Sequence, residues 1–208
     1  MSSKTPLKTV KKIVVARHGN TFEPYETPRR VGARTDIPLA GEGIAQAIAL
    51  GNYLKEHNLI PDRVFCSQLL RTRQTAEHAV AALGISREIT GRAFLNEIDY
   101  GPDENKTETQ VLKRISRRDL ERWDQEGVAP PGWLVDPQET KEGWLKFLDE
   151  VLKDKDCACC FAVTSNGIAR FLPLLLKPYQ SRLKLSTGHL AILEYSGEWI
   201  VKTWNAKP

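Results

Sequence analysis

The stretch Ile13-Val14-Val15-Ala16-Arg17-His18-Gly19-Asn20-Thr21 decides how the rest of the chain is interpreted. Its first four residues are apolar and predict a short buried β-strand. The strand stops abruptly at a cation, an imidazole and a glycine. Because ligands of open α/β sheets bind outside the carboxyl ends of the strands, this stretch predicts an α/β sheet with a binding site at the end of its first strand.

The residues that follow this strand suit an anionic ligand. Arg17 offers a planar fork of donors that matches phosphate, and Gly19 allows the backbone to approach a ligand closely. His18 is one of four histidines in the chain, and a neutral imidazole can attack phosphorus directly. A single Arg-His pair is usually only a strand end with a solvated arginine, so the interpretation depends on the rest of the sequence.

Length and composition fit one globular domain over residues 1–208. The chain is 41% hydrophobic and 27% charged, which is ordinary for such a domain. Its net charge of +4 arises from 30 basic and 26 acidic residues that are spread among one another. Some of the excess lies in the opening segment, at Lys4, Lys8, Lys11 and Lys12. A solvated surface explains this balance better than nucleic-acid binding does.

The sequence also bears on location and cofactors. The first seven residues lack the apolar segment of a secretion signal, and no apolar run reaches membrane-spanning length. The four cysteines fit no zinc pattern and are expected to be reduced thiols: Cys66, Cys157, Cys159 and Cys160. We therefore expect a cytoplasmic protein with no metal, no cofactor, and no membrane or nucleic-acid partner. The oligomeric state stays open, a homodimer included.

Hydrophobic periodicity predicts helices and strands in alternation. Helices are expected at residues 42–57, from just after Ser67 to Leu83, at 138–152 and at 165–176. Strands are expected at 13–16, 63–66 and 159–164, more weakly at 93–95, and as a final hairpin at 190–195 and 199–204. Alternating strands and helices indicate a three-layer α/β/α fold. Its sheet should be mostly parallel but mixed, because the last two strands pair in a hairpin.

Two polar segments interrupt this alternation. Residues 99–137 contain one predicted helix, at 108–123, and are too polar to bury a core of their own, so we expect a flap or insertion over the sheet edge. The long loop after Gly19 contains Arg29, Arg30 and Arg34, and a loop of this length is usually functional or mobile. We expect Arg30 and Arg34 to meet a second anionic group on the substrate, although a solvated basic loop is the simpler explanation.

Three places just after predicted strands carry groups that can bind an anion. The first is Arg17 with His18, and the second is Ser67 with Arg71. The third is the sequence at 165–167, Ser-Asn-Gly, where amides at the start of a helix can hold phosphate. Each has a common structural explanation when taken alone, such as a helix-surface arginine or a turn. Their occurrence in one chain, with the carboxylate of Glu97 after a short strand, favours a phosphate site.

The order of these motifs resembles the histidine phosphatase superfamily, also called the phosphoglycerate mutase-like family. The resemblance is carried by RHGNT at 17–21, GARTDIPL at 32–39 with Gly43 and Gln46, CSQLLRTRQTA at 66–76, Glu97 with Tyr100-Gly101, and VTSNG at 163–167. It is dense over residues 13–101, resumes at 159–170 and is thin between them.

This resemblance implies a phosphoglycerate mutase-like fold and phosphoryl transfer without a metal. His18 would be the nucleophile that forms a phosphohistidine, and Arg17 and Arg71 would clamp the phosphoryl oxygens. Glu97 would protonate the leaving oxygen. Two fixed guanidiniums would also keep the imidazole neutral and nucleophilic. Three further residues of the same motifs are expected to contact the substrate: Asn20, Thr21 and Gly167.

One position departs from the family pattern. Where the family has a second histidine in a Ser-His-Gly motif, this chain has Asn166. An asparagine amide can donate a hydrogen bond to a phosphoryl oxygen, but it carries neither a proton nor a charge for the reaction. His189, just before a late strand, could lean into the pocket as a substitute, although a structural role is the simpler explanation.

The leading hypothesis is a phosphatase that hydrolyses a small phosphorylated metabolite through a phosphohistidine on His18. One alternative is phosphoglycerate mutase-type transfer, in which the phosphoryl group returns to a second hydroxyl. Another is a phospho-ligand binding module whose catalysis has lapsed at Asn166. Nucleic-acid binding through the basic opening segment is the least favoured. The substrate stays open, because the flap carries little motif information.

Overall fold

Strand β1 (Lys11–Arg17) lies near the centre of a six-stranded sheet with the order β3-β2-β4-β1-β5-β6. It pairs in parallel with β4 (Cys159–Thr164) and antiparallel with β5 (Leu190–Tyr195). Residues 13–16 of β1 are completely buried, as their apolar sequence predicts. The computed structural model describes residues 10–179 and 182–208, so Lys4 and Lys8 lie outside the described residues.

The other strands complete a mixed sheet. Strand β2 (Arg63–Cys66) lies parallel to β4, and β3 (Ile89–Gly91) lies parallel to β2. Strand β6 (Trp199–Ala206) pairs antiparallel with β5 in the predicted hairpin. The expectation of a mostly parallel sheet with a final antiparallel pair is therefore confirmed.

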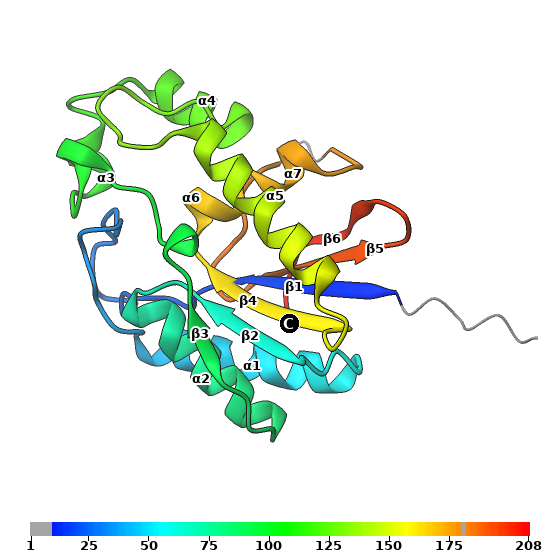
Figure 1. Cartoon of the computed structure of the whole chain (residues 1–208). Coiled ribbons are helices and arrows are strands. Elements are labelled where there is room, and N and C mark those ends of the chain that lie inside the picture. The colour runs from blue at the N-terminus through cyan, green and yellow to red at the C-terminus, as the bar shows by residue number, and fades with distance from the viewer. Residues whose placement is uncertain (1–9, 180–181) are drawn as a thin grey trace, which may run out of the picture.

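Helices cover both faces of the sheet. Helices α1 (Gly41–Glu56) and α2 (Leu70–Leu83) lie on one face, and α5 (Pro137–Lys153) lies on the other (Figure 1). Alternate side chains of β1 supply the two cores. Val14 and Ala16 join the cluster beneath α1 and α2, whereas Ile13 and Val15 join the cluster that contains the apolar stripe of α5. The three-layer α/β/α prediction is confirmed.

The chain after α5 and β4 is less regular than predicted. The helix expected at 165–176 is two short helices, α6 (Asn166–Ala169) and α7 (Leu172–Leu175). Pro173 explains the break, because it has no amide hydrogen to donate to the carbonyl one turn earlier.

Two smaller expectations near β2 and β3 are also wrong. Residues 93–95 form the 3-10 helix η1 (Ala93–Leu95), and the adjacent strand is β3. Ser67 does not cap α2 through its side chain, because the helix begins at Leu70. Its buried hydroxyl instead lies 2.6 Å from the hydroxyl of Thr72. Ser67 is therefore not free to bind an anion.

The predicted flap lies at the carboxyl end of β1, next to the loop after β1 (Figure 1). After the short 3-10 helix η2 (Gly101–Asp103) it has two helices, α3 (Glu108–Val111) and α4 (Arg117–Glu126), in place of the one helix expected at 108–123. The division occurs at Ser116, whose hydroxyl accepts a hydrogen bond from the amide of Asp119 and starts a new helix.

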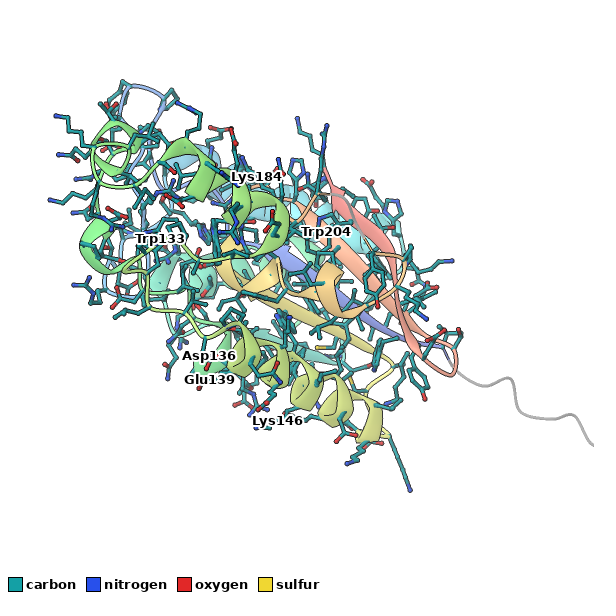
Figure 2. The ribbon with its side chains drawn as sticks, turned by 90° about the horizontal axis from the view of Figure 1, so that it is seen from above. Trp133, Asp136, Glu139, Lys146, Lys184 and Trp204 are labelled. Atoms are coloured by element: carbon teal, nitrogen blue, oxygen red, sulfur yellow. The ribbon has the colours of Figure 1, made fainter. Side chains whose placement is uncertain are left out.

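Trp133 lies within the flap (Figure 2) and holds its segments together. Its ring packs edge-on against Tyr100 at 4.7 Å and Trp123 at 5.5 Å between ring centroids. Its indole nitrogen donates to Asp103, a buried carboxylate that also pairs with Arg114. These aromatic residues belong to the same cluster as the apolar stripe of α5, so the flap has no separate core, as its polarity predicts.

Two expectations about the whole chain can be compared with this structure. The four cysteines are buried and none forms a disulfide, in agreement with reduced thiols. Within residues 10–179 and 182–208, no helix is long and apolar enough to cross a membrane.

The loop after β1 is held against the start of α1 by two glycines. A Cβ on Gly19 would lie 2.7 Å from Cα of Gly43, and a Cβ on Gly43 would lie 2.9 Å from the amide nitrogen of Asn20. Neither position has room for a side chain. Gly19 therefore allows the loop backbone to lie close to α1. Its amide donates to the hydroxyl of Thr75 at 3.1 Å.

We expect Gly43→Ala to lower the free energy of unfolding by about 1–3 kcal/mol, because the new methyl group forces the loop away from α1. Gly41→Ala in the same helix is the control, since the nearest atom to its Cβ is a carboxylate oxygen at 3.6 Å. That variant should be neutral or slightly more stable than the parent. Urea unfolding measures both, and equal stability of the two variants would contradict the packing argument.

Candidate active site

A cavity of about 660 Å³ lies at the carboxyl end of β1, under the flap. Its wall brings together four of the residues predicted to be catalytic: Arg17, His18, Glu97 and Asn166. They come from the ends of β1 and β4 and from the segment after η1. The convergence that the sequence predicts at the strand ends is therefore present.

His18 directly follows β1 and is only 5% exposed. Its amide donates to the carbonyl of Thr164 at the end of β4, at 3.0 Å. Its ring atom Nδ1 lies 2.8 Å from the carbonyl of Gly19, and Nε2 lies 3.3 Å from Nε of Arg71. A guanidinium can only donate, so Nε2 accepts and Nδ1 carries the proton. The unprotonated nitrogen, Nε2, is thus the available nucleophile.

The surroundings of His18 keep its ring neutral. Burial lowers the pKa of His18 well below its ordinary value, and the guanidiniums of Arg71 and Arg17 lower it further. The hydrogen bond to Gly19 opposes these effects but is smaller than each of them. The imidazole is therefore unprotonated at neutral pH.

Arg17 lies at the end of β1, half-buried in the cavity wall. One terminal nitrogen donates to the carbonyl of Leu185 at 3.0 Å. Its buried Nε has no hydrogen-bond partner in the described part of the chain. Donors therefore remain for an anionic ligand, and burial lowers the pKa of this guanidinium without preventing its protonation at neutral pH.

Arg71 reaches His18 from the first turn of α2 and is completely buried. Besides the contact with Nε2, its terminal nitrogens donate to the carbonyls of Val31, Gly32 and Thr35 at 3.0–3.3 Å. It does not line the cavity. In this structure Arg71 holds the ring of His18 and the loop around it, and the phosphoryl clamp expected of it stays a prediction.

Glu97 lies in the cavity wall and is 5% exposed. Its two carboxylate oxygens accept from the amides of Ile98 at 2.9 Å and Gly167 at 3.3 Å. A Cβ on Gly167 would lie 3.0 Å from Cδ of Glu97. Gly167 thus makes room for the carboxylate and its amide is already used, and the substrate contact expected of it stays a prediction.

Two polar residues follow β4. Ser165 is completely buried, and its hydroxyl has no partner within residues 10–179 and 182–208. The side-chain oxygen of Asn166 accepts from the amide of Leu185 at 2.9 Å. This hydrogen bond fixes the carboxamide, so its NH₂ group is the part that can donate to a ligand.

Three of the predicted substrate-binding residues line the cavity: Asn20, Thr21 and Arg30. Asn20 donates to Glu42 at 2.9 Å. Arg30 forms an ion pair with Glu108 at 2.9 Å and stacks over Trp133 at 4.9 Å. The charge of Arg30 is therefore already balanced by a protein carboxylate.

Two other predicted substrate contacts lie elsewhere. Arg34 forms an ion pair with Asp99 at 2.8 Å and donates to the carbonyl of Gly101 at 2.7 Å, outside the cavity wall. His189 lies outside the wall as well, with Nδ1 3.1 Å from the carbonyl of Asn205. Neither residue lines the cavity in this structure, because position next to a motif does not determine the direction of a side chain, and the substrate contacts expected of them stay predictions.

Sequence reasoning missed several residues of the cavity wall, among them Phe22, Trp123, Arg170 and Lys184. Arg170 is only 1% exposed, and its guanidinium stacks over Trp123 at 4.1 Å. A usable signal existed for this residue: it is a single cation within the otherwise uncharged stretch 157–176. In the described ranges, 10–179 and 182–208, no three His, Cys, Asp or Glu side chains are grouped to hold a metal ion.

Comparison with proteins of known sequence gives consistent matches. The chain is 32% identical over 178 residues to the 2,3-bisphosphoglycerate-dependent phosphoglycerate mutase of Bifidobacterium longum (strain DJO10A), which covers 83% of this chain and 68% of the mutase. For other curated mutases that it matches, the chain spans about half of their length.

Solved structures share the fold at lower sequence identity. Phosphoglycerate mutase from Bacillus anthracis str. Sterne has a TM-score of 0.80 at 19% identity, covering 96% of this chain and 94% of that one. A mycobacterial glucosyl-3-phosphoglycerate phosphatase has a TM-score of 0.76 at 20% identity, covering 95% and 99%. The predicted phosphoglycerate mutase-like fold is confirmed. The profile of the histidine phosphatase superfamily (branch 1) matches residues 13–207, and the chain therefore belongs to this superfamily.

Proposed function

We propose that this chain is a metal-independent phosphatase that hydrolyses a small phosphorylated metabolite through a phosphohistidine on His18. One observation carries the proposal: the unprotonated Nε2 of a buried, neutral imidazole lies 3.3 Å from a guanidinium nitrogen, in a cavity that also presents Arg17 and Glu97. Phosphoryl transfer needs mainly a positioned nucleophile and compensation of charge on the phosphoryl oxygens. This arrangement supplies both.

In the first step, the lone pair of His18 Nε2 forms a bond to phosphorus while the bond from phosphorus to the ester oxygen breaks. Glu97 donates its carboxyl proton to the departing oxygen, so the leaving group departs as an alcohol. Arg17 binds a phosphoryl oxygen through its unpartnered donors. The Nε–H of Arg71, which faces Nε2 before substrate binds, turns to a phosphoryl oxygen once Nε2 is bonded to phosphorus.

In the second step, water attacks phosphorus and the bond from phosphorus to Nε2 breaks. The carboxylate of Glu97 takes the proton from this water. Inorganic phosphate leaves, and His18 and Glu97 return to their starting protonation states. A general acid and base of this kind contributes about 10²–10⁴-fold.

Asn166 is proposed to donate a neutral hydrogen bond to the phosphoryl group. A charged histidine at this place would donate a bond about twice as strong, so the reaction should be slower here than with a second histidine. The presence of Asn166 in place of a second histidine also supports a second candidate, a phospho-ligand binding module without turnover.

A mutase reaction is the third candidate, and it is supported by the names of the curated relatives. In that case the phosphohistidine would be retained until a second hydroxyl accepts the phosphoryl group. Hydrolysis is preferred because a neutral Asn166 gives the bound intermediate less stabilisation than a cation would.

We expect the purified chain to hydrolyse p-nitrophenyl phosphate and His18→Ala to lose at least about a thousandfold in kcat/KM, because the nucleophile is removed. Asn166→His should raise kcat/KM roughly fivefold by adding a charge-assisted hydrogen bond. Asn166→Asp has nearly the same shape and should lower it, because it places a carboxylate near the phosphoryl group. Equal rates for the wild type and His18→Ala would refute the mechanism.

A rapid quench of the same reaction should trap one phosphoryl group on His18 that is labile to acid and stable to base. Binding of inorganic phosphate without any covalent label, by a correctly folded chain, would instead identify a binding module. The His18→Ala variant provides the background for the label.

The lowered pKa of His18 also predicts a pH dependence of stability. Below the ordinary imidazole pKa of about 6.5, the unfolded chain takes up a proton at this position before the folded chain does. The free energy of unfolding should therefore fall as the pH falls, by at most about 1.4 kcal/mol per pH unit from this group.

Urea unfolding of the wild type and His18→Gln at about pH 7.5 and about pH 5.5 measures this contribution. The glutamine variant lacks the titrating group, so it should lose less stability on acidification than the wild type does. Equal losses would show that the imidazole titrates alike in the folded and unfolded chains.

A further inference from the structure

The cavity extends well beyond His18, and its outer wall is not a cationic surface. Apart from Arg17 and Glu97 at the reaction centre, the wall contains four cations, Arg29, Arg30, Arg170 and Lys184. It also contains five carboxylates, which are Glu23, Glu26, Glu42, Glu108 and Asp124. The sign of its potential therefore depends on which of these groups are already paired.

Two of the four cations are neutralised by carboxylates of the same wall. Arg30 pairs with Glu108 at 2.9 Å, and Arg170 pairs with Asp124 at 3.4 Å. Arg170 is also buried and donates to the carbonyl of Trp123. Neither arginine can turn to a substrate without leaving its partner.

Within residues 10–179 and 182–208, the wall groups that form no ion pair carry a small excess of negative charge. Arg29 and Lys184 are exposed cations of the wall. Opposed to them are three carboxylates that accept hydrogen bonds from neutral donors: Glu23 accepts from the amide of Gly41 at 2.8 Å, Glu26 from the amide of Glu23 at 2.8 Å, and Glu42 from the side chain of Asn20 at 2.9 Å. These neutral hydrogen bonds leave the charges of the carboxylates uncompensated.

We infer that the substrate is a phosphate monoester of an uncharged, hydroxyl-bearing alcohol, and that a carboxylate or a second phosphate on the leaving group is disfavoured. The inference rests on the proposed function and specifies its substrate class. Carboxylate oxygens accept hydrogen bonds from hydroxyl groups, whereas they repel an anion at the same distance. The apolar faces of Phe22, Leu120 and Trp123 in the same wall suit the carbon skeleton.

This inference reverses the expectation that Arg30 and Arg34 hold a second anionic group. Arg34 lies outside the wall and Arg30 is paired. It also separates this chain from relatives whose names specify dependence on 2,3-bisphosphoglycerate, a molecule that carries several negative charges beyond one phosphoryl group.

Glycerol 1-phosphate and 3-phosphoglycerate form a matched pair of probes, because a terminal hydroxymethyl group in one is a carboxylate in the other. We expect kcat/KM to be at least about tenfold higher for glycerol 1-phosphate. An equal or higher value for 3-phosphoglycerate would overturn the inference while leaving phosphatase activity in place.

The affinity of the two esters for the His18→Ala variant provides a measurement that does not depend on turnover. Calorimetry should give tighter binding of glycerol 1-phosphate than of 3-phosphoglycerate, even if neither ester is hydrolysed by the wild type. Tighter binding of glycerol 1-phosphate supports the inference, and only a complete lack of hydrolysis by the wild type would contradict the proposed function. Tighter binding of 3-phosphoglycerate would overturn the inference alone.

Charge variants test the cause of the preference. Glu26→Gln should shift the ratio of the two kcat/KM values roughly twofold to threefold toward 3-phosphoglycerate, and the shift should shrink at high salt. Lys184→Ala should shift the ratio the other way. Glu139→Gln and Lys146→Ala are the controls, since both residues lie on α5, away from Lys184 (Figure 2), and should leave the ratio unchanged. If the ratio of the two kcat/KM values is unchanged in both Glu26→Gln and Lys184→Ala, the electrostatic argument is refuted.

Discussion

The contact between the guanidinium of Arg71 and Nε2 of His18 is the interaction on which the site depends. It fixes the tautomer, because a guanidinium only donates, and the proton must then lie on Nδ1 toward Gly19. It also places a buried cation beside the ring, which adds to the effect of burial in lowering the pKa of His18. One contact thus sets the orientation of the ring and identifies Nε2 as its unprotonated nitrogen. The remaining donors of Arg71 tie the loop at 31–35 to the same point.

Glycine makes this geometry possible at two positions where a backbone and another group must nearly touch. Gly19 and Gly43 let the loop after β1, which begins at His18, lie on the first turn of α1. Gly167 performs a comparable role for Glu97, whose carboxylate occupies the space that a Cβ would need. In both cases the glycine of the motif serves packing around a side chain of the cavity wall.

The sequence predicted the parts of this structure that depend on local pattern. Completely buried strands such as β4 and strand-end residues such as His18 follow from apolar runs and from the rule that sites form at strand ends. The directions of Arg34 and His189 could not be predicted, because each is determined by a partner distant in sequence, Asp99 for one and Asn205 for the other. The helix predicted at 108–123 is divided because Ser116 caps the start of α4, and hydrophobic periodicity alone does not detect such a cap.

The arginines of the outer wall illustrate why a basic loop need not mean a polyanionic ligand. Arg30 stacks on Trp133, which donates to Asp103 within the flap, and pairs with Glu108 on the flap itself. Arg170 joins β4's end to α4 through Trp123 and Asp124. The hydrogen bonds of both arginines attach the flap to the rest of the chain. If either were recruited by a second anionic group, its exposed carboxylate partner, Glu108 or Asp124, would be left unpaired, and the flap would lose one of its attachments to the rest of the chain.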